Sequence, residues 1–524
     1  MTAREAGALT PERHFDVIVV GAGLSGIGAA VHLQQQCPGK HVALLESRAA
    51  MGGTWDLFRY PGIRSDSDMH TLGYDFKPWR NPRAIADGPA ILDYIEETAR
   101  EHGVEGKIRF QHRVERARFS SEQARWELEV AVVSDGQERR ETFSCQFLLI
   151  CAGYFNYAHG HDPVFPGQER FQGPVVRPQH WPGDLDYRDQ RVVIIGSGAT
   201  AMTLVPALAE KAATVTMLQR SPTYMISRPA RDRLANLLRK LLPERWAYAI
   251  TRWKNSRLQR WLYRKSRSQP DWVRQRLLGR LRKELGPDFD LERHFTPSYQ
   301  PWDQRLCLVP DGDLYAALRS GRAEVVTDHI AEFTERGIRL QSGTELPADI
   351  IVTATGLELV VMGDIAFEVD GKAVDFSQCW TWRGMMYSGV PNMANTFGYI
   401  NASWTLRADL IARFVCRLLN HMDRKGLEQV TPTLRADEHD MPARPWIEGF
   451  SAGYLQRVMH LLPKQGDRDP WLNPQDYVSD RKTLPTASLE DGSLVFSHPG
   501  ALAGDRAQGW ENQAEDARCA DAAS

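Results

Sequence analysis

The glycine-rich turn Gly21-x-Gly23-x-x-Gly26 is the clearest candidate for chemistry in this sequence. Gly21 permits a tight turn, Gly23 lets the backbone approach a pyrophosphate, and Gly26 allows the following helix to pack closely on its strand. Glu46 ends the next apolar run about 20 residues later, where an acid binds ribose hydroxyls. The spacing predicts a site for an adenine dinucleotide whose ribose hydroxyls are free.

A second turn, Gly196-x-Gly198-x-x-Ala201, repeats the same device. The strand after it ends in Arg220 and Ser221, without the acid of the first copy. An acid would repel a 2′-phosphate, whereas a guanidinium can bind one, so this copy predicts NADPH rather than NADH. The predicted NADPH-binding residues are Gly196, Ser197, Gly198, Thr200, Arg220 and Ser221. A solvated arginine at a strand end stays an alternative for Arg220.

The two predicted sites differ in the ribose that they suit, and together they indicate FAD and NADPH, a pair in which nicotinamide passes a hydride to flavin. Residues 51–68, which follow the first unit, contain no cysteine, so the redox-active pair of a disulfide reductase is missing there. The seven cysteines are scattered and include no CxxC pair. This pattern argues against a disulfide framework and against a metal site, and it indicates a reducing compartment.

The elements that must position these residues follow the pattern of two βαβ units. Apolar runs predict strands at 16–20, 41–46, 107–110, 126–133, 147–151, 191–195, 214–221, 324–327 and 349–353, and helices are expected at 24–36 and 403–423. We predict an α/β fold with two Rossmann-like dinucleotide-binding domains and an inserted helical subdomain. The expected FAD-binding domain comprises residues 15–160 and 350–490. The expected linker and NADPH-binding domain comprises residues 161–349, with the helical insertion at about 231–300, and residues 500–524 are expected to be disordered.

The composition is that of an ordinary globular protein, with 524 residues, a net charge of −2 and 42% hydrophobic residues. It predicts no nucleic-acid partner, and the absence of an apolar leader or of an 18-residue apolar run predicts a cytoplasmic location. Residues 231–283 differ, because they hold 17 Lys or Arg against three acidic residues, with four tryptophans at near-helical spacing. Three interpretations stay open: a helical cover over the NADPH domain with tryptophans in its core, a weak peripheral membrane contact, or a nucleic-acid patch.

Two longer motifs carry a family resemblance. Residues 52–66, GGTWDLFRYPGIRSD, have the form GGxWxxxxYPGxxxD, and residues 171–182, FQGPVVRPQHWP, follow the form FxGxxxHxxxWP except at Arg177. An ATG at 354–356 after an apolar strand is a third match. Over about residues 15–490 the chain resembles the type I Baeyer–Villiger monooxygenases of the flavin-containing monooxygenase superfamily. Through residues 296–314 and 385–406 it is most similar to the ethionamide-activating monooxygenase subgroup.

The resemblance implies an enzyme that uses FAD, NADPH and O2 to convert a small lipophilic ketone to an ester or lactone through a C4a-peroxyflavin, with sulfoxidation of a sulfide as a second activity. Arg305 matches the family's active-site arginine, whose permanent charge would stabilise the anionic oxidant. Asp66 matches the carboxylate that orients this arginine. A surface ion pair for Arg305 and a helix cap for Asp66 stay open as alternatives.

The resemblance also extends the list of expected cofactor contacts and assigns the linker. Residues expected to contact FAD are Gly21, Gly23, Gly26, Glu46, Gly53, Thr54, Trp55, Asp66 and Val114. Residues 401–403 open the last long helix, either as donors to the flavin or as an ordinary N-cap. In the family, the linker at 171–182 relays motion between the two domains, and Arg177 stands where the family has histidine. We therefore expect a hinge hydrogen bond to be remade or lost, with weaker coupling.

Three other functions stay open at this point. A flavin monooxygenase that hydroxylates nitrogen or sulfur would need no pair of Arg305 and Asp66. An NADPH:quinone reductase would be supported only by the basic, tryptophan-rich segment at 231–283. A flavin-binding module could have lost turnover through Arg177.

Overall fold

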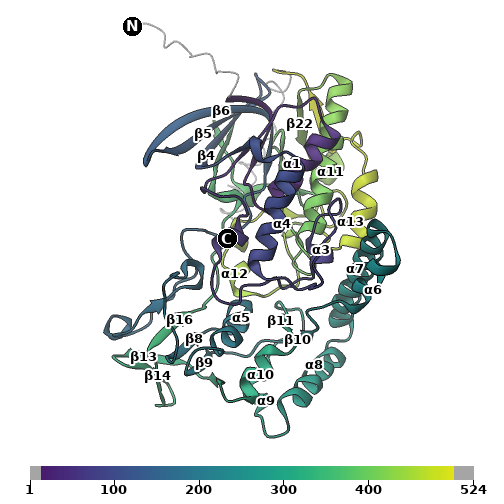
Figure 1. Cartoon of the computed structure of the whole chain (residues 1–524). Helices are drawn as coiled ribbons and strands as arrows, with labels where there is room; N and C mark the ends of the chain where they lie inside the picture. Colours follow the sequence, from purple (N-terminus) through teal and green to yellow (C-terminus); the bar gives the residue numbers. More distant parts are fainter. Residues whose placement is uncertain (1–12, 501–524) are drawn as a thin grey trace.

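The computed structural model describes residues 13–500, which form two α/β units with a helical insertion (Figure 1). The predicted α/β fold with two Rossmann-like units is confirmed. The tail expected to be disordered, residues 500–524, lies outside the described residues except for its first residue.

The first unit is built on a nine-stranded sheet in the order β18-β17-β4-β5-β6-β1-β2-β3, with β21 beside β6. Strand β1 runs parallel to β2 and β6, and its residues 17–19 are fully buried. A strand covered on both faces needs apolar residues throughout, which is why DVIVV shows no alternation. Helices α1 and α11 pack against each other over this sheet, with α4 nearby (Figure 1). The bounds are β1 (His14–Val20), β2 (Val42–Leu45), β3 (Ile108–Arg109), β4 (His112–Ser120), β5 (Arg125–Ser134), β6 (Gln137–Ile150), β17 (Ala366–Val369), β18 (Lys372–Ala373), β21 (Met393–Asn395), α1 (Leu24–Gln36), α4 (Gly88–Glu101) and α11 (Thr405–Lys425).

The second unit has a five-stranded parallel sheet in the order β12-β9-β8-β16-β7. Its elements are β7 (Val175–Val176), β8 (Arg191–Ile195), α5 (Ala199–Leu208), β9 (Thr214–Gln219), α10 (Asp313–Arg319), β12 (Ala323–Thr327) and β16 (Ile350–Thr353). Strand β16 is buried between β8 and β7, so residues 350–353 belong to this unit. The boundary expected between 349 and 350 therefore falls after Thr353, because the apolar run at 350–353 completes the second sheet.

Smaller elements complete the two units. They include α2 (Thr54–Leu57), α3 (Met69–Leu72), β10 (Met225–Arg228), β11 (Cys307–Pro310), β13 (Ile330–Thr334), β14 (Gly337–Leu340), β15 (Glu345–Pro347), β22 (Gln429–Pro432), α12 (Gly453–Gln456), α13 (Tyr477–Thr483) and β25 (Leu494–Ser497). No helix within residues 13–500 has both the length and the apolar character that crossing a membrane requires.

Two chain segments cross between the units side by side. The backbone N–H of Asn156 donates to Glu358 O at 2.9 Å, and that of Val360 donates to Tyr154 O at 3.0 Å. The linker at 171–182 attaches to the first of these segments. Gln179 Nε2 donates to Asn156 O at 2.6 Å, and the ring of His180 bonds to a backbone carbonyl at 158. The linker therefore connects the edge strand β7 to the chain that joins the two units.

The helical insertion consists of α6 (Arg233–Leu241), α7 (Glu244–Ser268), α8 (Pro270–Leu285) and α9 (Leu291–Phe295). Helix α7 packs against α3 and α13 of the first unit, whereas α8 packs against α10 of the second. The insertion therefore spans both units (Figure 1), and the expected cover over the NADPH domain alone is wrong for α7.

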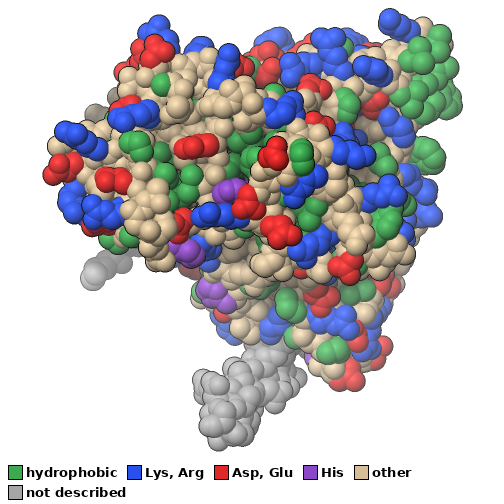
Figure 2. Space-filling view, turned by 90° about the horizontal axis from the view of Figure 1, so that it is seen from below, with side chains coloured by type: hydrophobic (Ala, Val, Ile, Leu, Met, Phe, Trp, Pro, Cys, Tyr) green, Lys and Arg blue, Asp and Glu red, His purple; other side chains and the backbone are tan. Residues whose placement is uncertain are grey.

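The tryptophans of the insertion lie at the surface rather than in a core. Trp246, Trp253, Trp261 and Trp272 are all exposed. Figure 2 shows hydrophobic side chains among Lys and Arg side chains along one edge of the molecule, on the side where Figure 1 places α6 and α7. The expectation that these tryptophans pack in a core is therefore wrong. Three of the four lie on α7, whose buried face is mostly polar.

Candidate active site

A cavity of about 530 Å³ connects the two units. Its lining includes nine of the predicted site residues, namely Gly21, Gly23, Glu46, Gly53, Thr54, Trp55, Asp66, Val114 and Arg305. Ala199 and Thr203, from the first turns of α5, line the same cavity. The cavity therefore extends from the first glycine-rich turn to the helix that follows the second.

The first glycine-rich turn leaves the start of α1 open. Gly21 has φ +100°, and a Cβ there would lie 2.7 Å from Cys151 O. A Cβ on Gly26 would lie 1.9 Å from Gly21 O, so Gly26 serves close packing, as expected. Gly23 is the N-cap of α1, and no side chain caps the helix. The uncapped N–H groups and the positive end of the helix dipole fit a dinucleotide pyrophosphate.

Glu46 is buried at the end of β2 and faces the same turn. Its two carboxylate oxygens accept from Ala22 N at 2.7 Å and from Arg48 N at 2.9 Å. Burial raises the pKa of Glu46, and these backbone donors oppose the rise. A carboxylate that lines the cavity beside the turn fits ribose hydroxyls, which can donate to its remaining lone pairs.

Arg305 and Asp66 meet in the cavity from distant parts of the sequence. Arg305 Nε lies 3.0 Å from Asp66 Oδ2, and the two side chains keep 34% and 36% of their surface exposed. Asp66 raises the pKa of Arg305 further above its usual value, although burial opposes this. The guanidinium is therefore a fixed positive charge inside the cavity. Asp66 does not cap a helix, since the N-cap of α3 is Asp68, which accepts from Thr71 N at 3.2 Å.

An aromatic wall beside Arg305 was not anticipated from the sequence. Tyr154 stacks on Trp404 with ring centroids 4.9 Å apart, and both line the cavity. Burial raises the pKa of Tyr154, and the charge of Arg305 partly opposes this. Tyr154 follows β6 without any recognisable spacing to a motif, so only its position just past a buried parallel strand could have indicated it.

The start of α11 also faces the cavity. Ala402 lines it, and the helix begins at Thr405 without a side-chain cap. Asn401 Nδ2 donates to Gln475 O at 2.9 Å, and Ser403 Oγ hydrogen-bonds to Thr71 Oγ1 at 2.7 Å. Neither side chain caps the helix, although the N–H groups of Leu406 and Arg407 donate to the carbonyls of Ser403 and Trp404.

The second glycine-rich turn has the same geometry as the first but lies on a more open face. Gly196 has φ +137°, and a Cβ there would lie 2.2 Å from Ala354 O. Gly198 is the N-cap of α5, again without a capping side chain. Thr200 hydrogen-bonds to Tyr60, whose pKa burial raises to about 12. The uncapped helix start suits a second pyrophosphate.

Arg220 and Ser221 are exposed at the end of β9, next to this turn. Ser197 Oγ donates to Ser221 O at 3.0 Å, which fixes the turn against the strand end. Arg220 forms no ion pair with any residue in the range 13–500. Its guanidinium is therefore available to an anionic ligand.

Arg177 of the linker forms an ion pair with the crossing segment. Its Nε lies 3.0 Å from Asp162 Oδ1, and its side chain is half exposed. Asp186, another acid near the linker, pairs with Arg188 at 2.6 Å. The contact expected at the family's histidine position is thus remade as an ion pair.

Comparisons with known proteins agree with this geometry. The sequence model of the flavin-binding monooxygenase-like family matches residues 79–361, and that of an NAD(P)-binding Rossmann-like domain matches residues 19–82. The FAD-containing monooxygenase EthA of Mycobacterium tuberculosis is 51% identical, over 92% of this chain and 98% of that protein. The probable FAD-binding monooxygenase AlmA of Acinetobacter baylyi is 48% identical, over 93% and 96%.

Solved structures share the fold. A steroid monooxygenase bound to NADP superposes with a TM-score of 0.75 at 24% identity, over 92% of this chain and 99% of that one. A cyclohexanone monooxygenase bound to epsilon-caprolactone superposes with a TM-score of 0.65 at 19% identity, over 80% and 90%.

Proposed function

The chain belongs to the flavin-binding monooxygenase-like family, and we propose that it catalyses the Baeyer–Villiger oxidation of ketones with FAD, NADPH and O2. In the balanced reaction, ketone, O2, NADPH and a proton give ester or lactone, NADP⁺ and water. One oxygen atom enters beside the carbonyl, and the other leaves as water. The observation that carries this proposal is the pair of Arg305 and Asp66 in the cavity between the two glycine-rich turns.

We assign FAD to the first unit, residues 15–160 and 354–490, and NADPH to the second, residues 161–353. The uncapped start of α1 would hold the FAD pyrophosphate, and Glu46 would accept from the adenosine ribose. The further proposed contacts to FAD are Gly53, Thr54, Trp55, Asp66 and Val114. Bound there, FAD would supply the acceptor for the hydride of NADPH and the activation of O2.

Arg305 would stabilise negative charge that develops on oxygen during the reaction. Its charge is fixed at every accessible pH, and it already stands in the cavity before substrate binds. Asp66 would position the guanidinium through the contact to Nε, so that the two Nη groups can donate to other partners, of which Tyr154 is one. This division of roles distinguishes the proposed chemistry from electrophilic oxygen transfer, which needs no such cation.

Arg220, together with Ser221, would bind the 2′-phosphate of NADPH at the end of β9, and the start of α5 would hold its pyrophosphate. The remaining proposed NADPH contacts are Gly196, Ser197, Gly198 and Thr200. The linker and the paired crossing segments would let the two units change their mutual position between reduction and oxygen transfer.

The proposed substrate is a small lipophilic ketone, with sulfoxidation of a sulfide as a second activity. A weak peripheral membrane contact through residues 231–283 belongs to the same proposal, since it would bring the enzyme to lipophilic substrates.

Anaerobic reduction with NADPH followed by a pulse of isotopically heavy O2 tests the reaction. We expect a long-lived species that absorbs in the near ultraviolet, and then an ester carrying one heavy oxygen atom from an aliphatic methyl ketone. An NADPH:quinone reductase would give no such species and no labelled ester. If a sulfide gives labelled sulfoxide, or an amine gives labelled hydroxylamine, while the ketone gives no labelled ester, the N- or S-oxygenating alternative is correct instead.

A further inference from the structure

Helix α7 has its apolar and polar faces reversed. Trp246, Trp253 and Trp261 are 67%, 54% and 52% exposed, and Ile250 lies on the same outward face. The spacing of four, three and eight residues follows one side of a helix. The buried side of α7 is mostly polar instead. Its members are Thr251, Arg252, Asn255, Ser256 and Ser266, together with Ala247 and Tyr248.

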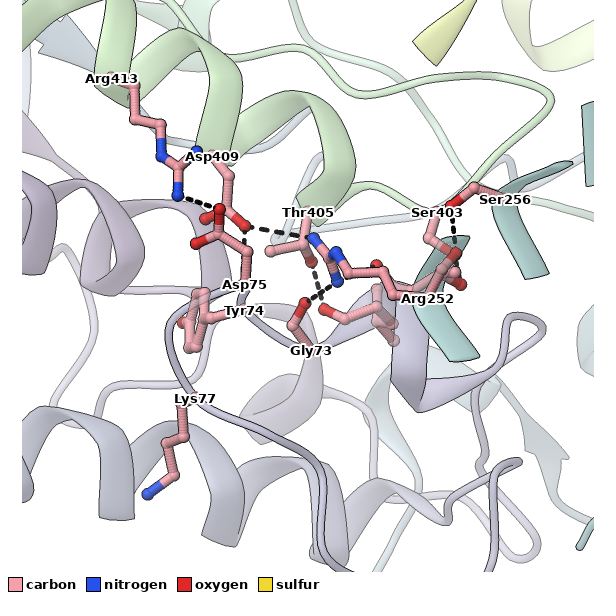
Figure 3. A network of polar contacts seen from close by, with 12 residues as sticks. Gly73, Tyr74, Asp75, Lys77, Arg252, Ser256, Ser403, Thr405, Asp409 and Arg413 are labelled. Carbon is pink, nitrogen blue, oxygen red and sulfur yellow. Dashed lines mark hydrogen bonds and ion pairs between the residues drawn. The ribbon is translucent and has the colours of Figure 1, made fainter. Parts of the chain in front are cut away.

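Polar contacts to the first unit hold α7 in this orientation (Figure 3). Arg252 Nη1 donates to the carbonyls of His70 at 3.0 Å and Gly73 at 2.7 Å, and Nη2 lies 3.3 Å from Asp409 Oδ2. Asn255 Nδ2 donates to Asp68 Oδ1 at 2.8 Å. Rotating the helix to bury its tryptophans would leave these buried polar groups without partners, so the outward apolar face is a fixed feature.

The apolar surface continues onto α6. Leu234, Leu237 and Leu241 are exposed and lie three and four residues apart, on one side of that helix. Of the twelve large hydrophobic side chains exposed within residues 13–500, ten lie in the segment 234–272. Contiguous apolar surface on this scale marks an interaction site.

Basic side chains surround this apolar surface. Lys240, Arg245 and Arg257 are exposed on α6 and α7, and the guanidinium of Arg257 lies 5.5 Å from the ring of Trp253. A hollow of about 610 Å³ beside α6 is lined by four basic residues, Arg83, Arg231, Arg233 and Lys240. The segment 231–283 carries 17 basic and three acidic residues in a chain whose net charge is −2, so the positive charge is concentrated here.

We propose that the outward face of α6 and α7 binds an anionic lipid bilayer, with the tryptophans and leucines in the interface and the basic side chains at the phosphates. Aliphatic residues such as Leu241 and Ile250 suit acyl chains, whereas a nucleic acid offers them no partner. Two copies of the same basic face would repel each other, which disfavours a dimer through this surface. Arginine beside tryptophan places a cation at headgroup level over an apolar ring.

The place of this surface also bears on how substrate reaches the active site, an inference that rests on the proposed function. A hollow of about 90 Å³ lies between α7, α13 and the start of α11, and its lining includes Tyr263, Ala402 and Tyr477. Ala402 lines the main cavity as well. The two cavities share Ala402 in their linings, and the proposal includes that a ketone dissolved in the bilayer enters through the smaller one toward Arg305.

Cosedimentation of the full-length protein with vesicles tests the surface itself. We expect binding to phosphatidylcholine vesicles that contain phosphatidylglycerol, weaker binding to phosphatidylcholine alone, and no displacement by inorganic phosphate. The double variant Trp246→Ser/Trp253→Ser should lower the partition coefficient about tenfold or more. The triple variant Lys240→Ala/Arg245→Ala/Arg257→Ala should lower it about a hundredfold, since each basic residue contributes about a fivefold factor.

Matched controls come from other faces of the molecule. Leu461→Ser removes an exposed apolar side chain, and Arg322→Ala/Arg336→Ala/Lys372→Ala removes three exposed basic ones, so both should bind vesicles as the wild type does. The proposal is overturned if the wild type does not bind the mixed vesicles or if the tryptophan variant binds unchanged. Displacement by phosphate, or binding to duplex DNA as tight as to vesicles, overturns it as well.

Kinetics with two ketones test the link to substrate delivery. For a long-chain ketone dissolved in the vesicles, the tryptophan variant should show a raised apparent KM, whereas a short, water-soluble ketone should be oxidised as by the wild type. The delivery step would be overturned if the tryptophan variant had the wild-type KM for the long-chain ketone, or if its KM rose equally for both ketones. If the wild type oxidises neither ketone, the proposed function fails, while vesicle binding still decides the membrane surface.

Discussion

Replacing Arg305 with alanine removes the fixed charge from the cavity while leaving both glycine-rich turns intact. Arg305 Nε contacts Asp66 at 3.0 Å and neither turn depends on it, so both nucleotides should still bind. We expect NADPH to reduce bound FAD at close to the wild-type rate. Ketone oxidation should be lost, because the charge is needed only where oxygen becomes negative.

The size of the loss follows from what the guanidinium contributes. Removing one preorganised donor from a developing oxyanion lowers the rate about 100- to 1,000-fold, or roughly 2.7–4 kcal/mol. Both side chains of the pair keep about a third of their surface exposed, so solvent screens part of the field and the lower end is expected. Arg305→Lys keeps the charge but loses the planar contact to Asp66. Its rate of ketone oxidation should therefore lie between those of the wild type and of Arg305→Ala.

Stopped-flow reduction and product analysis separate the two steps. Arg64→Ala is the matched control, because Arg64 lines the same cavity but is already paired with Asp313. It should keep most of the ketone oxidation that Arg305→Ala loses. Asp66→Asn should add no further loss to Arg305→Ala, since a positioning residue has no effect once its partner is gone. Ester formation by Arg305→Ala at a rate near the wild type would refute the reasoning.

Three further predictions concern the nucleotide sites and the linker. Arg220→Ala should raise the KM for NADPH but not for NADH, because only NADPH has the 2′-phosphate. The lost charge-assisted contact corresponds to roughly 1.5–3 kcal/mol. An unchanged ratio of the two KM values would show that Arg220 does not bind this phosphate. Burial raises the pKa of Glu46 in the folded protein, so the folded state binds this proton more tightly than the unfolded state does. The resulting stabilisation is fully present below the unfolded pKa of about 4.3, and it is lost as the pH rises through the pKa of the folded protein. Glu46→Gln should therefore flatten the melting temperature of the apoprotein against pH in that window, which thermal denaturation measures. Arg177→His should lower the hydrogen peroxide released per NADPH consumed, and equal release from both proteins would contradict a role for Arg177 in coupling.

The parts of the fold that the sequence predicted well are those whose signal is local. Helix α1 has the predicted bounds, because a glycine-rich turn fixes its start and a buried strand precedes it. The meander of β4, β5 and β6 was predicted only in part, because charged residues alternate along β4. There Arg118 pairs with Glu129 of the neighbouring strand, and Arg116 pairs with Glu368, which is distant in sequence.

The residues of the candidate site also differ in how far the sequence predicts them. The turns and Glu46 could be predicted from spacing, and Arg305 and Asp66 from a family motif. Tyr154 could not, since its role depends on contact with Arg305 and Trp404 that no spacing encodes. The orientation of α7 escaped prediction for a different reason. Periodicity reveals that a helix has two unlike faces, but which face is buried depends on the partner, here the carbonyls in and just after α3 that accept from Arg252.

The linker shows how a departure from a family motif can be compatible with function. An arginine cannot accept a hydrogen bond, so it cannot copy a histidine that does. Arg177 instead pairs with Asp162, and the neighbouring Gln179 and His180 bond to backbone carbonyls of the same crossing segment. Because two of the three contacts use the backbone, they do not depend on the identity of the side chains in that segment. The attachment therefore survives the substitution, and only the half-exposed ion pair remains sensitive to salt and to the relative position of the two units.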